Sequence, residues 1–350
     1  PGVVAAQSQA DEVTYSRDIA PILQENCQKC HRPESVAPMS LLTYDEVRPY
    51  ATRIQRRTAL RDRRGVMPPW FIERDVGIQH FRNDEALTEG EIEMIAAWVA
   101  AGAPEGDPAD LPVAPEFSDE PNWDIGAPDL VIDLPDFTME RHAPDWWGVI
   151  EPVPSGLTED RHVAAMQVLE ISDAEGGVGG NFIYHHAIIA STDENGRMSG
   201  SWPIHEVGRN AEYFDPKASP ILRAGSQFFI PGVHMHSNAQ TTTAHLRLGF
   251  KFQPRDYEPT RRRGNLTFGN GEIDLRPMEA GQEIHFYQEL GQNMKLPTFE
   301  PHMHASGVRM CMEAIWGHNI ETLTCAGYDH NWVKQYIYAD DYAPLLPKGT

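Results

Sequence analysis

The spacing of apolar residues predicts three helices in the first hundred positions. The first covers residues 16–26 and the second covers residues 44–60. The third begins at Thr88, because Thr88 and Glu91 have the spacing of a capping box, and it ends at Gly102. The apolar stripe of the first helix is Ile19, Ile22 and Leu23, and that of the third is Ile92, Ile95, Trp98 and Val99. This pattern predicts an all-α N-terminal domain.

The pattern changes after residue 130, where short apolar runs are separated by Gly and Pro. Four of these runs have the length and composition of strands: Val163–Ile171, Phe182–Ala190, Gln227–His236 and Ala244–Phe252. Short strands with turn residues between them favour antiparallel sandwiches or jelly rolls over an alternating β-α-β arrangement. The expected fold class is therefore multidomain, with an all-α domain followed by two all-β jelly-roll domains.

A proline-rich stretch marks the boundary between the two patterns. It has little apolar periodicity and is typical of an extended linker. The expected domains are residues 1–110, a linker over 111–128, a first jelly roll over 129–256 and a second over 257–350. The last residues, Leu345–Thr350, resemble the approach to a further strand, so the second jelly roll is expected to be incomplete at its C-terminal end.

The charge balance narrows the classes of partner. The chain has 350 residues with 51 acidic and 29 basic side chains, and its formal charge is −22. Such a charge repels phosphate backbones and anionic lipid head groups, which argues against a nucleic-acid partner. The apolar runs, such as residues 94–101, are far shorter than the roughly 20 residues that span a bilayer. A protein without a transmembrane segment is expected, and the start at Pro1 is typical of a processed N-terminus.

The strongest chemical signal is Cys27-Gln28-Lys29-Cys30-His31. In this spacing, Cys27 and Cys30 can form thioether bonds to the two vinyl groups of one haem, while His31 reaches the iron. The alternative is a redox dithiol or half of a zinc site, but the sequence has no second cysteine pair at zinc-finger spacing. The motif predicts that residues 1–110 are a c-type cytochrome domain with one covalent haem.

The sixth ligand of the iron is expected from a loop between the second and third helices. Met67 lies in such a loop, in the segment Val66-Met67-Pro68-Pro69-Trp70, and is the preferred candidate. His80 is the competing candidate, while Met39 follows the haem motif too closely to cross the haem easily. A Met ligand raises the reduction potential relative to a second His.

Three paired histidine motifs lie in the β-rich part of the chain. His185-His186 stands in an apolar run that is typical of a buried strand. Adjacent strand residues point to opposite faces, so both rings can bind one metal only where the strand is twisted or bulged. His234-Met235-His236 and His302-Met303-His304 differ, because residues two apart share a face of the strand. Imidazole suits copper, zinc, nickel or iron, so ligand type leaves the metal open.

Cys311 and Cys325 flank a segment that resembles two strands around the turn Gly317-His318-Asn319. A symmetric hairpin centred on His318 places the two cysteines directly opposite each other, within reach of a disulfide once the strands twist. The alternative is a pair of buried free thiols. A disulfide here, like a covalent haem, indicates an oxidising compartment.

From about Asp129 to Thr350 the chain resembles the copper type II monooxygenases, the family of peptidylglycine α-hydroxylating monooxygenase and dopamine β-monooxygenase. The resemblance is carried by the order of a His-His strand, a histidine strand entering a polar hairpin, and a His-x-His strand. The preceding haem region is similar to the cytochrome module fused to such copper domains in bacterial proteins.

The resemblance implies two copper sites. His185, His186 and His236 would bind the first copper, with His234 as a neighbour. The second copper would take His302 and His304 together with a Met thioether from a later strand. The nearest Met is Met310, but six residues of strand span about 20 Å, so it reaches that ion only if the chain folds back sharply.

The function expected from these features is that of an exported haem and copper redox enzyme, periplasmic or extracellular. By resemblance, the haem passes electrons to copper, and copper inserts oxygen into a C–H bond of a small-molecule substrate. A redox partner protein or a small reductant would reduce the haem. The first alternative is an electron-transfer or assembly subunit with a non-catalytic copper-domain scaffold. The second alternative is zinc binding or copper storage.

Overall fold

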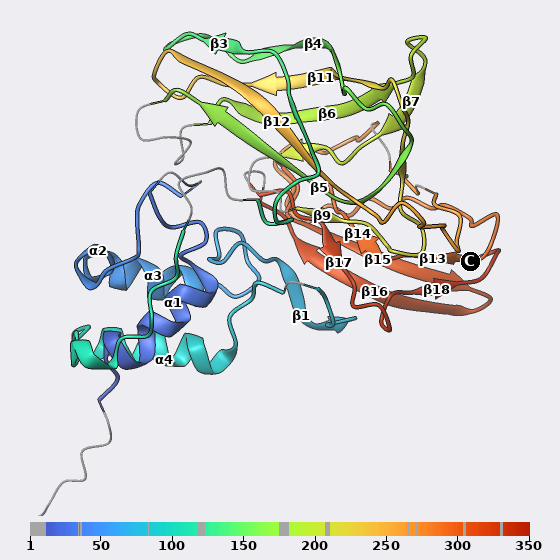
Figure 1. Ribbon diagram of the computed structural model, residues 1–350. Helices are drawn as coiled ribbons and strands as arrows, with labels where there is room; N and C mark the ends of the chain where they lie inside the picture. The colour runs from blue at the N-terminus through green and yellow to red at the C-terminus, as the bar shows by residue number, and fades with distance from the viewer. Residues whose placement is uncertain are drawn as a thin grey trace, which may run out of the picture.

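The computed structural model describes residues 12–33, 35, 37–82, 84–117, 123–174, 182–206, 211–264, 266–269, 272–303, 306–329 and 332–350. Figure 1 shows the helices gathered on one side of the molecule and the sheets on the other. The chain thus has a helical N-terminal part followed by several antiparallel sheets, which is the coarse architecture predicted from the sequence. No helix in the described ranges is both long and apolar enough to cross a membrane.

The helical part contains the three predicted helical regions. A π-helical turn, Tyr15–Ile19, leads into α1, Ala20–Asn26. The second region is divided into α2, Tyr44–Val47, a 3-10 turn, Arg48–Tyr50, and α3, Ala51–Thr58. The interruption coincides with Pro49, which has no N–H to donate to the carbonyl four residues earlier.

Helix α4, Glu89–Ala100, is the third predicted helix, and its capping box is confirmed. The Thr88 hydroxyl accepts a 3.3 Å hydrogen bond from the Glu91 N–H, and the Glu91 carboxylate accepts one of 2.7 Å from the Thr88 N–H. The completely buried Trp98 donates from its indole N–H to the carbonyl of Pro104. This contact holds the chain against the helical core directly after α4 ends.

The strands between Leu130 and Phe252 form two antiparallel sheets that pack face to face around one apolar cluster. In the first sheet the order is β10-β5-β12-β2, with β3 beside β12 and β9 beside β5; in the second it is β4-β11-β6-β7, with β8 beside β6. The strands of the first sheet are β2 (Leu130–Asp133), β3 (Phe137–Met139), β5 (Arg161–Ser172), β9 (Glu212–Tyr213), β10 (Ile221–Leu222) and β12 (Thr242–Phe252). Those of the second are β4 (Trp146–Pro154), β6 (Tyr184–Thr192), β7 (Met198–Ser201), β8 (His205–Glu206) and β11 (Gln227–Met235).

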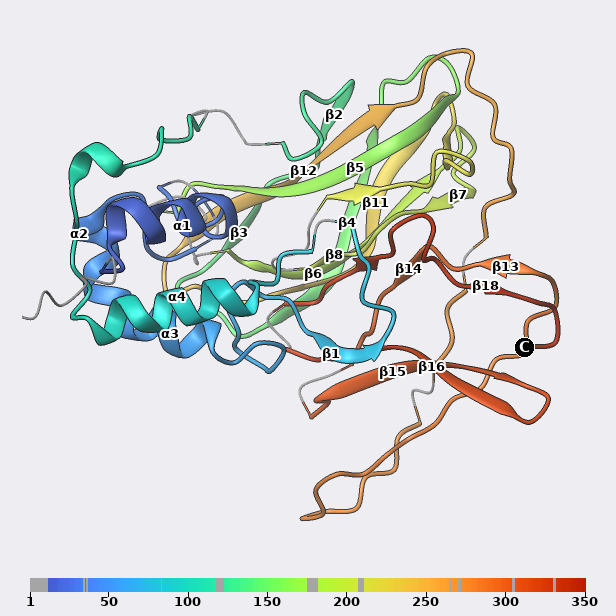
Figure 2. The ribbon, with the colours of Figure 1, turned by 90° about the horizontal axis from the view of Figure 1, so that it is seen from below.

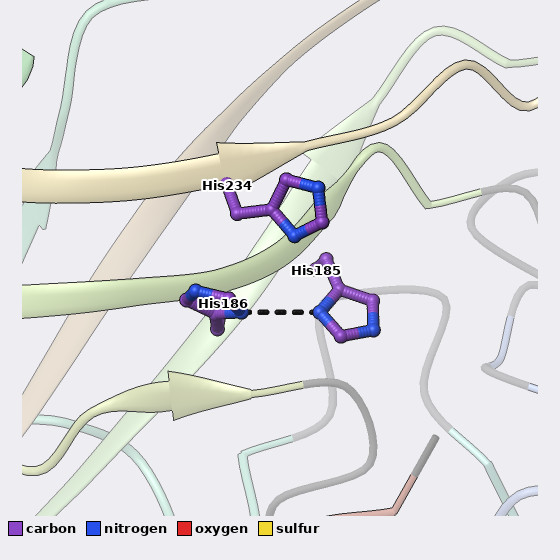
Figure 3. A group of neighbouring side chains, drawn as sticks. All are labelled: His185, His186 and His234. Atoms are coloured by element: carbon purple, nitrogen blue, oxygen red, sulfur yellow. Dashed lines mark hydrogen bonds between the residues drawn. The ribbon is translucent and has the colours of Figure 1, made fainter. Parts of the chain in front are cut away.

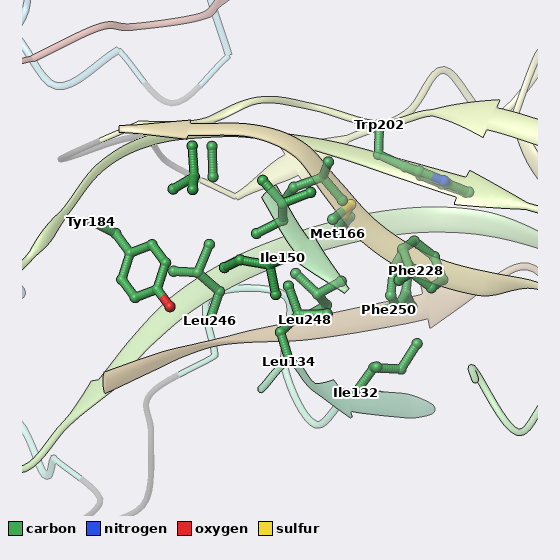
Figure 4. Packing of buried hydrophobic residues seen from close by; sticks show 14 of the residues in the cluster. Ile132, Leu134, Ile150, Met166, Tyr184, Trp202, Phe228, Leu246, Leu248 and Phe250 are labelled. Carbon is green, nitrogen blue, oxygen red and sulfur yellow. The ribbon is translucent and has the colours of Figure 1, made fainter. Parts of the chain in front are cut away.

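The core of this sandwich follows from alternation along the strands. On β12, Ala244, Leu246, Leu248 and Phe250 are buried at every second position. Figure 4 shows Leu246, Leu248 and Phe250 in one cluster with residues from the facing sheet, including Phe228. The four predicted strands correspond to β5, β6, β11 and β12, each displaced by no more than two residues at its ends.

The C-terminal part contains short strands and one long hairpin. The short pairs are β13 (Met294–Lys295) with β18 (Leu345–Leu346), and β14 (Thr298–Phe299) with β17 (Tyr336–Ile337). The hairpin consists of β15 (Arg309–Trp316) and β16 (Asn319–Gly327), and β16 also pairs with β1 (Ile72–Gly77) from the N-terminal part. Figure 2 shows β1 beside this hairpin.

This pairing is accompanied by a shared apolar core, which the sequence pattern did not predict. Trp70 and Ile72 pack in one cluster with Phe299, Ala326 and Tyr336. The segment that follows the predicted axial-ligand loop is therefore anchored to the C-terminal part of the chain.

The predicted disulfide between Cys311 and Cys325 is confirmed. The two cysteines are direct partners in the β15–β16 register, as the symmetric hairpin required. The turn is one residue shorter than predicted, because Trp316 already pairs with Asn319. The register then shifts near Leu323, between the pair Glu313–Thr322 and the pair Met312–Thr324, so a bulge restores the alignment of the cysteines.

Candidate functional site

Three histidine rings converge on one face of the second sheet. They belong to His185 and His186 on β6 and to His234 on the adjacent β11. One nitrogen from each ring lies within 4.8 Å of the corresponding nitrogen of the other two, so the group can hold a metal ion. Figure 3 shows the three rings turned toward one another.

The sheet register explains how two adjacent histidines reach one site. His234 is the direct partner of His186, while the next residue on β11, Met235, is already opposite Tyr184. His185 is therefore an extra residue on β6, which is the arrangement of a β-bulge. The Nδ1 atoms of His185 and His186 are 3.1 Å apart. The bulge required by the sequence argument is thus present at the expected pair.

Two neighbours orient the His234 ring: Asp145, which directly precedes β4, and Trp147, which lies on β4. The Nε2 atom of His234 lies 2.9 Å from the Asp145 carboxylate, and the Trp147 ring stacks on the imidazole with a centroid distance of 3.9 Å. With Nε2 facing Asp145, the other nitrogen of His234 is turned toward His185 and His186 (Figure 3). A carboxylate on the outer nitrogen is the common way in which proteins fix a metal-binding imidazole.

His236, predicted as the third ligand, lies immediately beside this group. Its ring centroid is 5.6 Å from that of His185, and its backbone N–H donates to the Ile183 carbonyl. Burial lowers the pKa of its imidazole. The group of three nitrogens contains His234 in place of His236. From the sequence alone both His234 and His236 could supply the third nitrogen, since residues two apart share a face of the strand. The pairing of His234 with His186 distinguishes the two candidates.

The beginning of β6 is held from the facing sheet by Glu170 on β5. Its carboxylate accepts hydrogen bonds from the N–H groups of Ile183, at 2.8 Å, and Tyr184, at 3.1 Å. Burial raises the pKa of Glu170 to about 8. Since His185 follows directly, these two bonds restrain the backbone at the bulge.

The residues of the predicted second copper site lie in the C-terminal part. The Nδ1 atom of His302 is 3.4 Å from a carboxylate oxygen of Glu206, which raises the pKa of the His302 imidazole. His304 lies outside the described residues. Met310 is opposite Ala326 on the hairpin and packs against the core that contains Trp70. Met310 is thus a partly buried residue that packs against this core.

The Cys27–His31 motif forms a compact turn at the end of α1. The N–H groups of Cys30 and His31 both donate to the Cys27 carbonyl, and both Cys27 and Cys30 carry free thiols. The His31 ring places Nδ1 3.2 Å from the Met39 carbonyl, which leaves Nε2 for a metal. This donor set suits a covalently attached haem, because two thiols and an oriented imidazole come from a single turn.

The two candidates for the sixth iron ligand have different surroundings. Met67 is half-buried in the loop between α3 and α4, as predicted, and its N–H donates to the Arg57 carbonyl. His80 is exposed, and its ring stacks on Tyr342 with a centroid distance of 3.7 Å. The stacking gives His80 a surface contact with the C-terminal part.

Comparisons with protein-family models, with curated proteins and with solved structures each found no match. The assignment of a function therefore depends on the chemistry of the site. Three imidazoles form a set of neutral nitrogen ligands that suits copper, zinc, nickel or iron.

Proposed function

We propose that this protein is an exported redox enzyme that carries a covalent haem and copper, and that the haem supplies electrons to a copper-dependent monooxygenase centre. The observation that carries the proposal is the convergence of His185, His186 and His234 on one point of the sheet. The disulfide between Cys311 and Cys325 is consistent with an oxidising compartment.

The haem half of the proposal rests on Cys27, Cys30 and His31. The contact of His31 Nδ1 with the Met39 carbonyl fixes the ring and leaves Nε2 to bind iron. We assign Met67 as the opposite ligand because it stands in the loop between α3 and α4. A bound haem would supply one-electron transfer, and bound copper would supply reaction with dioxygen.

Copper is preferred over zinc because the same chain carries the proposed haem site. Zinc has no redox chemistry, so an electron carrier in the same chain would have no role beside it. Copper accepts imidazole ligands and changes oxidation state, which gives the haem an acceptor. The resemblance to copper type II monooxygenases points to the same metal.

The chain's own residues would position the first copper. Asp145 and Trp147 fix the ring of His234, while the bulge turns His185 to the same side as His186. In this proposal His236 is a neighbour of the site and His234 a ligand, which exchanges the roles that the resemblance implied.

The finer parts of the resemblance also belong to the proposal. They are the jelly-roll class of both β regions, the domain limits 1–110, 111–128, 129–256 and 257–350, and a second copper at His302 and His304. A small-molecule substrate and a redox partner protein or small reductant complete it.

The decisive test is the iron and copper content of the purified full chain and of matched variants. We expect one covalent haem iron per chain, and we expect His234→Ala to lower copper affinity at the first site by at least about tenfold. His245→Ala is the matched control, since His245 lies on β12 of the facing sheet and contacts Asp136. Haem without stoichiometric copper would instead support the electron-transfer or assembly subunit, and zinc in the histidine group would exclude the oxygenase.

The axial assignment has its own test. Met67→Ala is expected to lower the reduction potential of the haem, because a thioether ligand favours the ferrous state. His80→Ala serves as the control and should leave the potential unchanged. The reverse result would transfer the assignment to His80.

A further inference from the structure

Four residues form a continuous row across the second sheet. Trp147 on β4 is opposite His234 on β11, His234 is opposite His186 on β6, and His186 is opposite Glu206 on β8. Directly opposed residues in antiparallel strands share a face of the sheet. The row therefore places a carboxylate on the same face as the three-histidine group and beside one of its members.

Glu206 is unusual among the described carboxylates because it is buried without full pairing. Its exposed fraction is only 4%, and its Oε2 atom has no hydrogen-bond partner among the described residues. A buried charge is normally paired, hydrogen-bonded or bound to a metal. Its Oε1 atom lies 3.4 Å from Nδ1 of His302, which comes from the C-terminal part of the chain.

The separation of these two atoms suits two ligands of one ion. A hydrogen bond between nitrogen and oxygen is typically about 2.7–3.2 Å long. Two ligand atoms that are each about 2.1 Å from a metal are about 3.4 Å apart when the angle at the metal is near 110°, which is close to tetrahedral. Carboxylate and imidazole are both ordinary metal ligands.

We propose that Glu206 and His302 are ligands of a second metal site, with nitrogen and oxygen donors, next to the three-histidine group. The inference deepens the proposed function, on which it rests for the presence of a metal at His302. It replaces the thioether expected from the resemblance with a carboxylate, in agreement with the packing of Met310 against the cluster that contains Trp70.

The donor set determines which ions the site prefers. Cuprous copper favours soft sulfur ligands, whereas imidazole with carboxylate suits divalent ions such as Cu²⁺, Zn²⁺, Fe²⁺ and Mn²⁺. The site also lies close to the first one, since Glu206 and His186 are paired across neighbouring strands about 4.8 Å apart. The second sheet itself would then contribute to both metal sites.

The test is a Co²⁺ titration of the full chain. Bound metals are first removed, Co²⁺ is then added in steps, and its binding is followed by visible absorption. The His234→Ala variant is the parent, because it lacks a ligand of the first site and therefore binds metal there more weakly, which leaves the second site easier to observe. Adding Glu206→Gln should weaken Co²⁺ binding at the second site at least about tenfold and change the absorption bands at saturation. The matched control is Glu212→Gln, which removes a buried carboxylate of β9 in the facing sheet and should change neither.

Each outcome decides the inference. Unchanged Co²⁺ affinity in the Glu206→Gln variant would overturn it, and so would weaker binding with an unchanged saturated spectrum, which would make Glu206 a positioning residue. Should Glu206→Gln fail to fold, His302→Ala on the half-exposed partner must give the same loss, and unaltered binding there refutes the site. Failure of the proposed function would appear separately, as absence of haem or of copper at the first site in the unsubstituted chain.

Discussion

The haem motif and the three-histidine group are built in opposite ways. In the first, Cys27, Cys30 and His31 come from one turn, and short-range backbone bonds to the Cys27 carbonyl hold them. In the second, the ligands come from β6 and β11, and the register between these strands decides which rings meet. A local site depends on one helix end, whereas a site made by register depends on the whole sheet.

This difference predicts what damages each centre. A one-residue shift of β11 against β6 would turn every side chain of that strand to the opposite face, and the group would be lost. The turn at Cys27–His31 is held by backbone hydrogen bonds to the Cys27 carbonyl and not by pairing between strands, so it should withstand such a change. The following predictions test this separation, from the largest effect to the smallest.

The largest effect is expected from the double variant Cys27→Ser and Cys30→Ser. Without thiols no thioether bond can form, so the denatured chain should lose its haem stain completely. Copper content at the histidine group should remain, because its ligands belong to another part of the fold. A haem stain that survives in the denatured variant would contradict covalent attachment through these residues.

The second-largest effect is expected at the β15–β16 hairpin, which joins the C-terminal part of the chain to β1 of the N-terminal part. Replacing Cys311 and Cys325 by Ser should reduce the free energy of unfolding by about 3 kcal/mol, the chain-entropy value for a loop of roughly 15 residues. Because β16 also pairs with β1, urea unfolding followed by haem absorbance should show the loss. An unchanged haem transition would mean that the shared core of Trp70 and Phe299 does not couple the two parts.

The contrast also explains how much could be predicted from sequence. The turn that brings Cys27, Cys30 and His31 together, the capping box at Thr88 and the strand that carries His185 and His186 depend on neighbouring residues, so sequence patterns could locate them. The presence of His234, rather than His236, in the group of three nitrogens could not be predicted, because it depends on a register set by contacts between residues about fifty positions apart. The paired residues of β1 and β16 are even farther apart in the sequence, and β1 has no clear alternation of buried and exposed residues. Sequence patterns therefore could not locate this pairing.

The third prediction concerns the residues that orient His234. Asp145→Asn should weaken copper binding about 10-fold to 100-fold, as substitutions beside a metal-binding imidazole commonly do. The exposed Asp160, paired with Arg223, provides the control Asp160→Asn, which removes the same charge elsewhere on the sandwich. Equal copper affinity in both variants would show that Asp145 has no part in holding the ring.

The smallest effect is a pH dependence that arises from Glu170. Burial raises its pKa from 4.5 to about 8, so between these values the carboxyl is protonated in the folded chain and ionised in the unfolded chain. The folded state then binds more protons, and stability falls as the pH rises through the window. The contribution is fully present below pH 4.5 and is lost as the pH rises toward about 8.

Glu170→Gln removes this proton and therefore this slope. We expect the free energy of unfolding of the unsubstituted chain, measured with urea, to fall relative to the variant across that window. Glu159→Gln, at an exposed carboxylate, is the control and should follow the parent curve. Parallel curves for Glu170→Gln and the parent would show that Glu170 is ionised in the folded state throughout. In that case the N–H groups of Ile183 and Tyr184 would be bonded to a full charge, and the start of the histidine strand would be held equally well throughout that window.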